Sequence, residues 1–96
     1  MDIKFDISDF VDTLTIQSAH NQLVEREKRR RKQMKISQRQ LAVRSGVSYA
    51  SIRRFETTGD ISLSSLLKIA NALDCLEEFI SLFPPVPVKN LKDYKV

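Results

Sequence analysis

The stretch "LAVRSGVSYASIRRFE", residues 41–56, decides the fold that we expect for this chain. Its apolar and small residues recur at helical spacing on both sides of one glycine, Gly46, which favours two short helices joined by a tight turn. Ala42 is small enough to let the second helix approach the first closely. Five residues are expected at the crossing of the two helices: Leu41, Ala42, Val47, Ile52 and Phe55. Their spacing around Gly46 predicts a helix-turn-helix arrangement.

Serine residues mark the starts of three helices. Ser37, followed three residues later by Gln40, forms a capping box ahead of the first helix of the pair. Ser48 caps the second helix, which we expect to end at about residue 57. Ser62 caps a further helix that we expect to be largely buried. Its expected buried residues are Leu63, Leu66, Leu67, Ile69, Ala70 and Leu73.

Two more helices flank these three. A highly charged helical stretch precedes the motif and ends near Met34. After the motif, Asp74 with Glu77 predicts another capping box and a last helix that reaches Phe83. The prolines of "FPPVP", residues 83–87, end that helix because proline cannot continue it. The fold class that follows is an all-α domain of five helices.

The two ends of the chain differ from its middle. Residues 2–7, "DIKFDI", alternate polar and apolar side chains, which predicts a short β-strand. A single strand needs a partner, so we assign residues 1–14 to an extension that contacts a second subunit or another protein. The helix-turn-helix domain is expected to span residues 15–83. Residues 84–96 are expected to form a proline-rich, extended C-terminal arm.

Charge is concentrated in one part of the chain. Residues 26–54 hold eleven basic residues against one acidic residue, Glu27, a net charge of +10 within a chain of net charge +4. The other residues hold five basic and eleven acidic groups. Such a basic zone indicates a polyanionic partner. A solvated helix face would explain "REKRRRKQMK", residues 26–35, equally well, so charge alone leaves both interpretations open.

The second helix of the pair has an outward face that suits the major groove of DNA. This face follows from turning the apolar residues of the helix inward. It holds Tyr49, Ala50, Arg53, Arg54 and Thr57. Arginine can bond a guanine edge through two donors, alanine can touch a thymine methyl group, and tyrosine can stack or reach a phosphate. The alternative is a solvated helix whose arginines have no partner.

Residues 23–83 resemble the Xre family, the Cro and phage-repressor type of helix-turn-helix domain. The resemblance is carried by "ISQRQLAVRSGVSYASIRRFE", residues 36–56, and "SLSSLLKIANAL", residues 62–73. It implies binding to double-stranded DNA, with Gln38 on a phosphate and recognition positions that include Ser48. The expected base contacts are Tyr49, Ala50, Arg53 and Arg54. The expected phosphate contacts are Gln38, Arg39, Arg44, Ser48 and Thr57. The resemblance also implies an ion pair between Arg31 and Glu56 that braces two helices, while Ala42 and Gly46 shape the turn.

The chain departs from the family pattern at several positions. Glu27 and Arg30 stand where the family usually has apolar residues. The loop "ETTGD", residues 56–60, is one residue longer than usual. The segment "RRFETTGDISLSSLLKIANAL", residues 53–73, together with the later "LFPP", residues 82–85, is similar to the sequences of HipB-type antitoxins. That similarity implies an antitoxin that represses its own gene and binds a HipA-like toxin kinase.

Other classes of function find little support. No apolar run approaches the roughly 18 residues that cross a bilayer, and the basic helix lacks the bulky apolar face of an interfacial helix. The only histidine, His20, is expected on the surface. The only cysteine, Cys75, is expected to be a partly buried packing residue, and a single cysteine fits a protein of the reducing cytoplasm. No nucleophile–base set is found. We therefore expect no catalytic residue, no metal and no cofactor, and a protein that is not an enzyme.

Two functions remain. The first is a transcriptional repressor that binds a palindromic operator as a homodimer. The second is a protein-interaction module, the antitoxin-type partner of a kinase, in which DNA binding is secondary. The dimer interface is left open between the N-terminal strand and the last helix. The candidate interface residues of that helix are Phe79, Ile80, Leu82 and Phe83.

Overall fold

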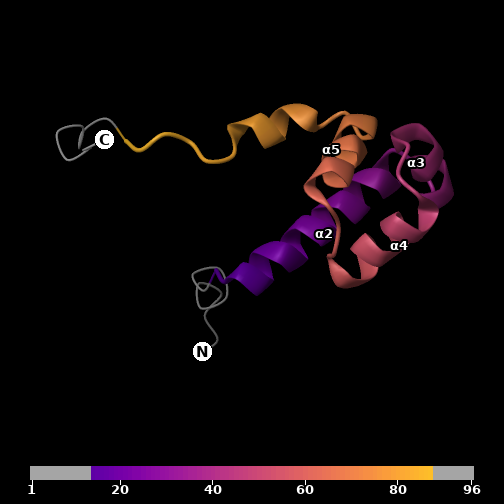
Figure 1. The fold of residues 1–96 in the computed structure, drawn as a ribbon, viewed down its shortest axis with the longest axis horizontal. Helices are drawn as coiled ribbons and strands as arrows, with labels where there is room; N and C mark the ends of the chain where they lie inside the picture. Colours follow the sequence, from indigo (N-terminus) through magenta and orange to yellow (C-terminus); the bar gives the residue numbers. More distant parts are fainter. Residues whose placement is uncertain (1–13, 88–96) are drawn as a thin grey trace, which may run out of the picture.

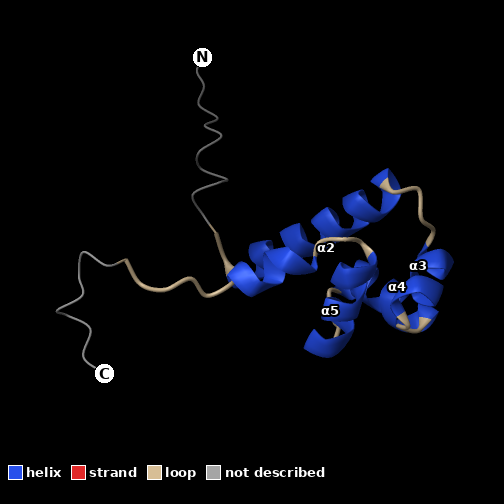
Figure 2. Ribbon diagram, turned by 90° about the horizontal axis from the view of Figure 1, so that it is seen from above, coloured by secondary structure: helices blue, strands red, loops and turns tan. Residues whose placement is uncertain are grey.

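The computed structural model describes residues 14–87, and within them the chain forms four α-helices and one 3-10 helix (Figure 1). The elements are α2 (Ile16–Gln33), α3 (Gln38–Ser45), α4 (Tyr49–Thr58), α5 (Leu63–Ala72) and the 3-10 helix η1 (Leu76–Ser81). Figure 2 shows helices and loops, and no strand, along these residues. The all-α fold class is thus confirmed, while the strand predicted at residues 2–7 lies outside the described residues.

The helix starts are set by the side chains that the sequence indicated. At α3, Ser37 Oγ accepts a hydrogen bond from the Gln40 backbone N–H at 3.0 Å, and Gln40 Oε1 accepts one from the Ser37 N–H at 2.8 Å. This reciprocal pair confirms the capping box. Ser48 caps α4 and Ser62 caps α5, each accepting from a backbone N–H three residues later. Thr15, which the sequence did not single out, caps α2 in the same way.

The core lies where α3 packs against α4 and α5. Leu41 and Ile52 are fully buried at this crossing, and Val47 and Phe55 are almost so. Ala42 is half-buried and packs against the same cluster. Gly46 ends α3 in the left-handed conformation, with φ of 76°, which confirms its predicted role in the turn. The predicted helix-turn-helix packing is therefore present.

The last helix differs from the prediction. The predicted capping box of Asp74 and Glu77 is wrong, because Asp74 has φ of 58° and the residue before η1 is Cys75, which makes no side-chain cap. η1 is a short 3-10 helix that ends at Ser81, and the chain after it leads away from the other helices (Figure 1). Phe83 is 96% exposed. A segment with neither a cap nor a buried apolar face has little to stabilise an α-helix.

Two other predicted features are corrected. Leu63, expected to be buried in α5, is 68% exposed because it is the first residue of that helix. His20, expected on the surface, is half-buried, and its Nε2 donates a hydrogen bond to the Gly59 carbonyl oxygen at 2.8 Å. This contact joins α2 to the end of α4. Gly59 has φ of 84°, and a Cβ there would lie 2.7 Å from His20 Nε2.

We predict that Gly59→Ala destabilises the domain more than Gly46→Ala. Both glycines are left-handed, a conformation that costs an alanine about 1–2 kcal/mol. Only at Gly59 must the new methyl group also displace His20, since a Cβ at Gly46 meets no atom within 4 Å. Urea unfolding of the two variants measures the difference. Equal losses would show that the contact with His20 contributes nothing.

Candidate nucleic-acid interface

The orientation of α4 is fixed by the side chains on its buried face. Ile52 is 0% exposed and Phe55 1%, so α4 cannot rotate without opening the core. Three of the residues assigned to base contacts (Ala50, Arg53 and Arg54) are exposed. Thr57, assigned to phosphate contact, is also exposed on this helix. The structure thus brings these four residues together on one exposed surface.

Tyr49, the fourth residue assigned to base contact, is half-buried rather than free. The Arg39 guanidinium lies 4.1 Å from the centre of its ring, and the Arg53 guanidinium lies 5.7 Å away. Both distances fit cation–π contacts. Tyr49 therefore connects an arginine of α3 to an arginine of α4 and orients both. Sequence reasoning did not find this stacking, because Arg39 and Tyr49 are on different helices.

Arg54 has a neighbour of opposite charge. Its Nη2 lies 3.2 Å from Asp60 Oδ2, and both side chains are about two-thirds exposed. An ion pair this open to solvent is weak, so Arg54 can exchange it for another acceptor. The loop that carries Asp60 is held by Thr58, whose hydroxyl donates to the Arg54 carbonyl oxygen at 2.7 Å and accepts from the Asp60 N–H at 3.1 Å. The longer "ETTGD" loop thus places an acid beside the outward face.

The remaining residues assigned to phosphate contacts surround the start of α3 and the turn. Arg39, Arg44 and Ser48 are exposed, and the Ser48 side chain also caps α4. Gln38 is half-buried, and its Nε2 donates a hydrogen bond to Glu56 Oε1 at 3.0 Å. Gln38 therefore links the start of α3 to the end of α4 within the protein itself.

Arg31 and Glu56 form a buried ion pair between α2 and α4. Arg31 Nε and Nη2 each donate to one Glu56 carboxylate oxygen at 2.8 Å, and Nη1 donates to the Ile36 carbonyl oxygen at 3.0 Å. The hydrogen bond to Glu56 raises the pKa of Arg31. Burial by itself would raise the pKa of Glu56, but its interactions with the side chains of Arg31, Glu27 and Gln38 lower it overall. The carboxylate is therefore held ionised.

Glu27 is buried beside this pair. Both of its carboxyl oxygens are shielded from solvent and have no hydrogen-bond partner. Burial, followed by the nearby Glu56 carboxylate, raises the pKa of Glu27 to about 8. Sequence reasoning flagged Glu27 only as a departure from the family pattern. The signal available was its helical spacing: Glu27 falls on the same face of α2 as Val24 and Arg31.

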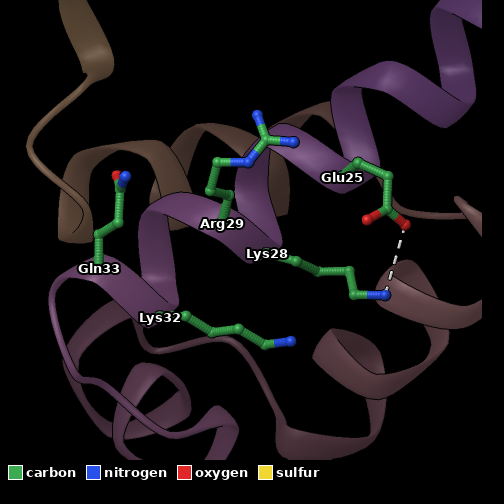
Figure 3. A pocket seen from close by; sticks show the side chains of 5 residues that line it. All are labelled: Glu25, Lys28, Arg29, Lys32 and Gln33. Carbon is green, nitrogen blue, oxygen red and sulfur yellow. Dashed lines mark hydrogen bonds and ion pairs between the residues drawn. The ribbon is translucent and has the colours of Figure 1, made fainter.

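The basic run of α2 divides into structural and solvent-facing residues. Besides Arg31, Arg30 is structural: its Nε donates to the Leu73 carbonyl oxygen at 2.6 Å and its Nη2 to the Asp74 carbonyl oxygen at 2.9 Å, at the end of α5. Lys28 lies 3.4 Å from Glu25 (Figure 3). Figure 3 also shows Lys28 and Lys32 extending in the same direction from the helix. The net charge of residues 26–54 thus overstates the charge free for a partner.

Comparison with known proteins agrees with this geometry. The chain matches the family described as helix-turn-helix over residues 28–80, more than half of its length and all of α3, α4 and α5. The chain belongs to this helix-turn-helix family. The family is of the Cro/C1 type, and membership makes this protein a DNA-binding regulator in which α3 and α4 form the motif. No curated protein and no solved structure gave a significant match. None of the helices between residues 14 and 87 has the length and apolar character to cross a membrane.

We predict that Arg31→Ala strongly destabilises this helix-turn-helix domain. Removing one partner of a buried pair leaves an uncompensated charge, which costs about 3–5 kcal/mol. Here it leaves Glu56 beside Glu27 with no arginine between α2 and α4. The control is Arg29→Ala, which removes an exposed arginine of the same helix. Chemical unfolding of both variants measures the effect, and a loss for Arg31→Ala no larger than for Arg29→Ala would contradict it.

Proposed function

We propose that this protein is a sequence-specific transcriptional regulator, a repressor that inserts α4 into the major groove of double-stranded DNA. The observation that carries the proposal is the pair of adjacent exposed arginines, Arg53 and Arg54, on a helix locked by a buried core. Arginine at such a position can bond a guanine through two parallel hydrogen bonds. A rigid helix lets these bonds form without ordering the backbone at the moment of binding.

In this proposal the residues of the interface divide into two groups. Tyr49, Ala50, Arg53 and Arg54 read base edges, and the Tyr49 ring also packs against the Arg53 guanidinium. Arg39 and Arg44, with Gln38, Ser48 and Thr57, contact phosphates and set the position of α4 in the groove. Each phosphate neutralised steepens the fall of affinity with salt by about 0.9 in the logarithmic slope. Substitution of Arg44, an exposed residue in the last turn of α3, would reduce that slope without changing base preference.

We predict that Arg54→Ala relaxes base preference at one position of the site. The expected loss is about 1–3 kcal/mol on a selected site, with less change on scrambled DNA. The selected site comes from enrichment of a random DNA pool, and gel-shift titration measures both affinities. Asp60→Asn is the matched variant, because it frees Arg54 from its exposed acidic neighbour and should raise affinity. Arg53→Ala is compared beside them. Equal losses on selected and scrambled DNA would overturn the assignment of Arg54 to base contact.

We further propose that the regulator binds a palindromic operator as a homodimer through the segment that follows α5. That segment exposes apolar side chains: Ile80 is 81% exposed, Leu82 57% and Phe83 96%. Contiguous exposed apolar side chains mark contact surfaces in proteins of this size. Two copies joined there would present their α4 helices to half-sites about 34 Å apart, one turn of DNA.

We predict that the double substitution Ile80→Asp and Phe83→Asp dissociates the dimer without unfolding the monomer. Both side chains are exposed, so the change should leave the free energy of unfolding of the monomer within about 0.5 kcal/mol. Sedimentation measures the mass of the wild type, the variant and a chain lacking residues 1–8. A dimer that survives the double substitution but not the deletion would assign the interface to the N-terminal extension.

The same exposed segment favours a second candidate function, an antitoxin that binds a HipA-like kinase and represses its own gene. An apolar surface next to a DNA-binding domain can serve a protein partner as readily as a second copy. Co-purification with the product of the neighbouring gene distinguishes the two. The absence of a complex at micromolar concentration would remove the antitoxin function and leave the repressor.

A further inference from the structure

Glu27 is the charged side chain whose surroundings fit it least. It lies on the inward face of α2, is 8% exposed, and has two carboxyl oxygens without a hydrogen-bond partner. Charged residues are rarely buried unless they are paired. Arg31, the cation that favours its ionised form most, is already engaged, because it directs its bonds to Glu56 and to the Ile36 carbonyl oxygen. Glu27 thus adds a second carboxyl group to a site that holds one guanidinium.

Two carboxyl groups at one buried cation cannot both ionise cheaply. Like charges in a shielded site repel, so one group keeps its proton. Glu56 is the ionised one, since it accepts hydrogen bonds from both Arg31 and Gln38. Glu27 accepts none, so the proton belongs to Glu27. A neutral Glu27 leaves the ion pair between α2 and α4 undisturbed, whereas an ionised Glu27 would compete for Arg31 and repel Glu56.

We propose that Glu27 is a positioning residue for the recognition helix, acting as a neutral acid that leaves Arg31 wholly to Glu56. This proposal rests on the proposed function only for the measurement of DNA affinity. The effect of Glu27 on the ion pair, and through it on α4, does not depend on DNA binding. Protonation of Glu27 stabilises α4 in its observed place. Loss of that proton loosens α4 through Glu56, which lies in the last turns of the helix.

The charges around Glu27 agree with this role. Lys28 and Arg31 on α2 favour its ionised form, and Glu56 on α4 opposes it. Beyond α5, Cys75 is near enough for Glu27 to contribute to the raised pKa of its thiol, although burial is the main cause. The balance leaves the pKa of Glu27 at about 8, against 4.5 for the ordinary carboxyl. Glu27 is therefore mostly neutral at pH 7.

The sign of the pH dependence follows from that shift. A group whose pKa is raised on folding takes up a proton as the chain folds. Its stabilising contribution is complete below pH 4.5, the pKa of the unfolded chain, and is lost as the pH rises to about 8. Within this window the unfolding equilibrium constant should rise about tenfold per pH unit through this one group.

The test compares wild type with Glu27→Gln, which keeps the shape and a donor but cannot ionise. Glu25→Gln is the control, because it removes an exposed carboxylate from the same helix. Urea unfolding at pH 5.5 and 7.5 gives the ratio of the two unfolding constants for each protein, and comparison between proteins removes the contribution of every group that the substitution does not affect. Between the two pH values, we expect the unfolding constant of the wild type to rise about a hundredfold more than that of Glu27→Gln. It should rise by the same factor as that of Glu25→Gln. Parallel pH profiles for wild type and Glu27→Gln would overturn the proposal.

Two further measurements keep the test decisive. If Glu27→Gln does not fold, the carboxyl carbon of Glu27 in the wild type is followed by NMR, and a midpoint near 4.5 instead of about 8 overturns the proposal. For DNA, affinity for the selected site is measured at pH 6.5 and 9. We expect the affinity of the wild type for this site to fall at pH 9, and the affinity of Glu27→Gln to show no such additional fall. If no DNA binds at either pH, the proposed function fails, while the unfolding profiles still decide the role of Glu27.

Discussion

A single buried ion pair connects the helices that this protein must hold in register. Arg31 binds both oxygens of Glu56, and Gln38 adds a third bond to the same carboxylate, so α2, α3 and α4 meet at one group. Packing at Leu41 and Ile52 supplies the apolar part of the same junction. Replacing such a pair by apolar residues can be neutral for stability, but the bonds of the pair are directional, and they join α4 to α2 at one defined place. These bonds, together with the buried side chains of Ile52 and Phe55, fix which face of α4 points outward.

Positive charge in this chain serves two separate purposes. Arg30 and Arg31 are used within the protein, one at the end of α5 and one against α4. Arg53 and Arg54 stand outside, next to Tyr49 and Asp60 respectively. A basic zone in a sequence is therefore an upper limit on the charge that a polyanion can meet. What remains free is divided between the solvent-facing residues of α2, which include Arg26, Arg29 and Lys32, and the arginines on α4 and near the turn, where a helix-turn-helix protein approaches DNA.

The parts of the fold that were predictable from sequence rest on short-range rules. Caps at Ser37, Ser48 and Ser62 depend on bonds to backbone groups three residues away, and the turn at Gly46 depends on one left-handed residue. The prediction of a capped last helix was wrong because a local sequence rule was not reinforced by packing against the rest of the protein. At Asp74 the capping pattern was present, but the backbone turned left-handed and no side chain of η1 beyond it is fully buried.

The sequence by itself determined the helical class, the turn and four of the five residues expected on the outward face of α4, because periodicity and capping act within one or two helical turns; Tyr49 is the exception, since it is half-buried. Only the tertiary structure decided how those residues are partnered. The stacking of Arg39 on Tyr49, the contact of His20 with Gly59 and the burial of Glu27 join residues from different helices. Such contacts depend on how helices cross, and a carboxyl group acquires a pKa of about 8 only when the crossing removes it from water.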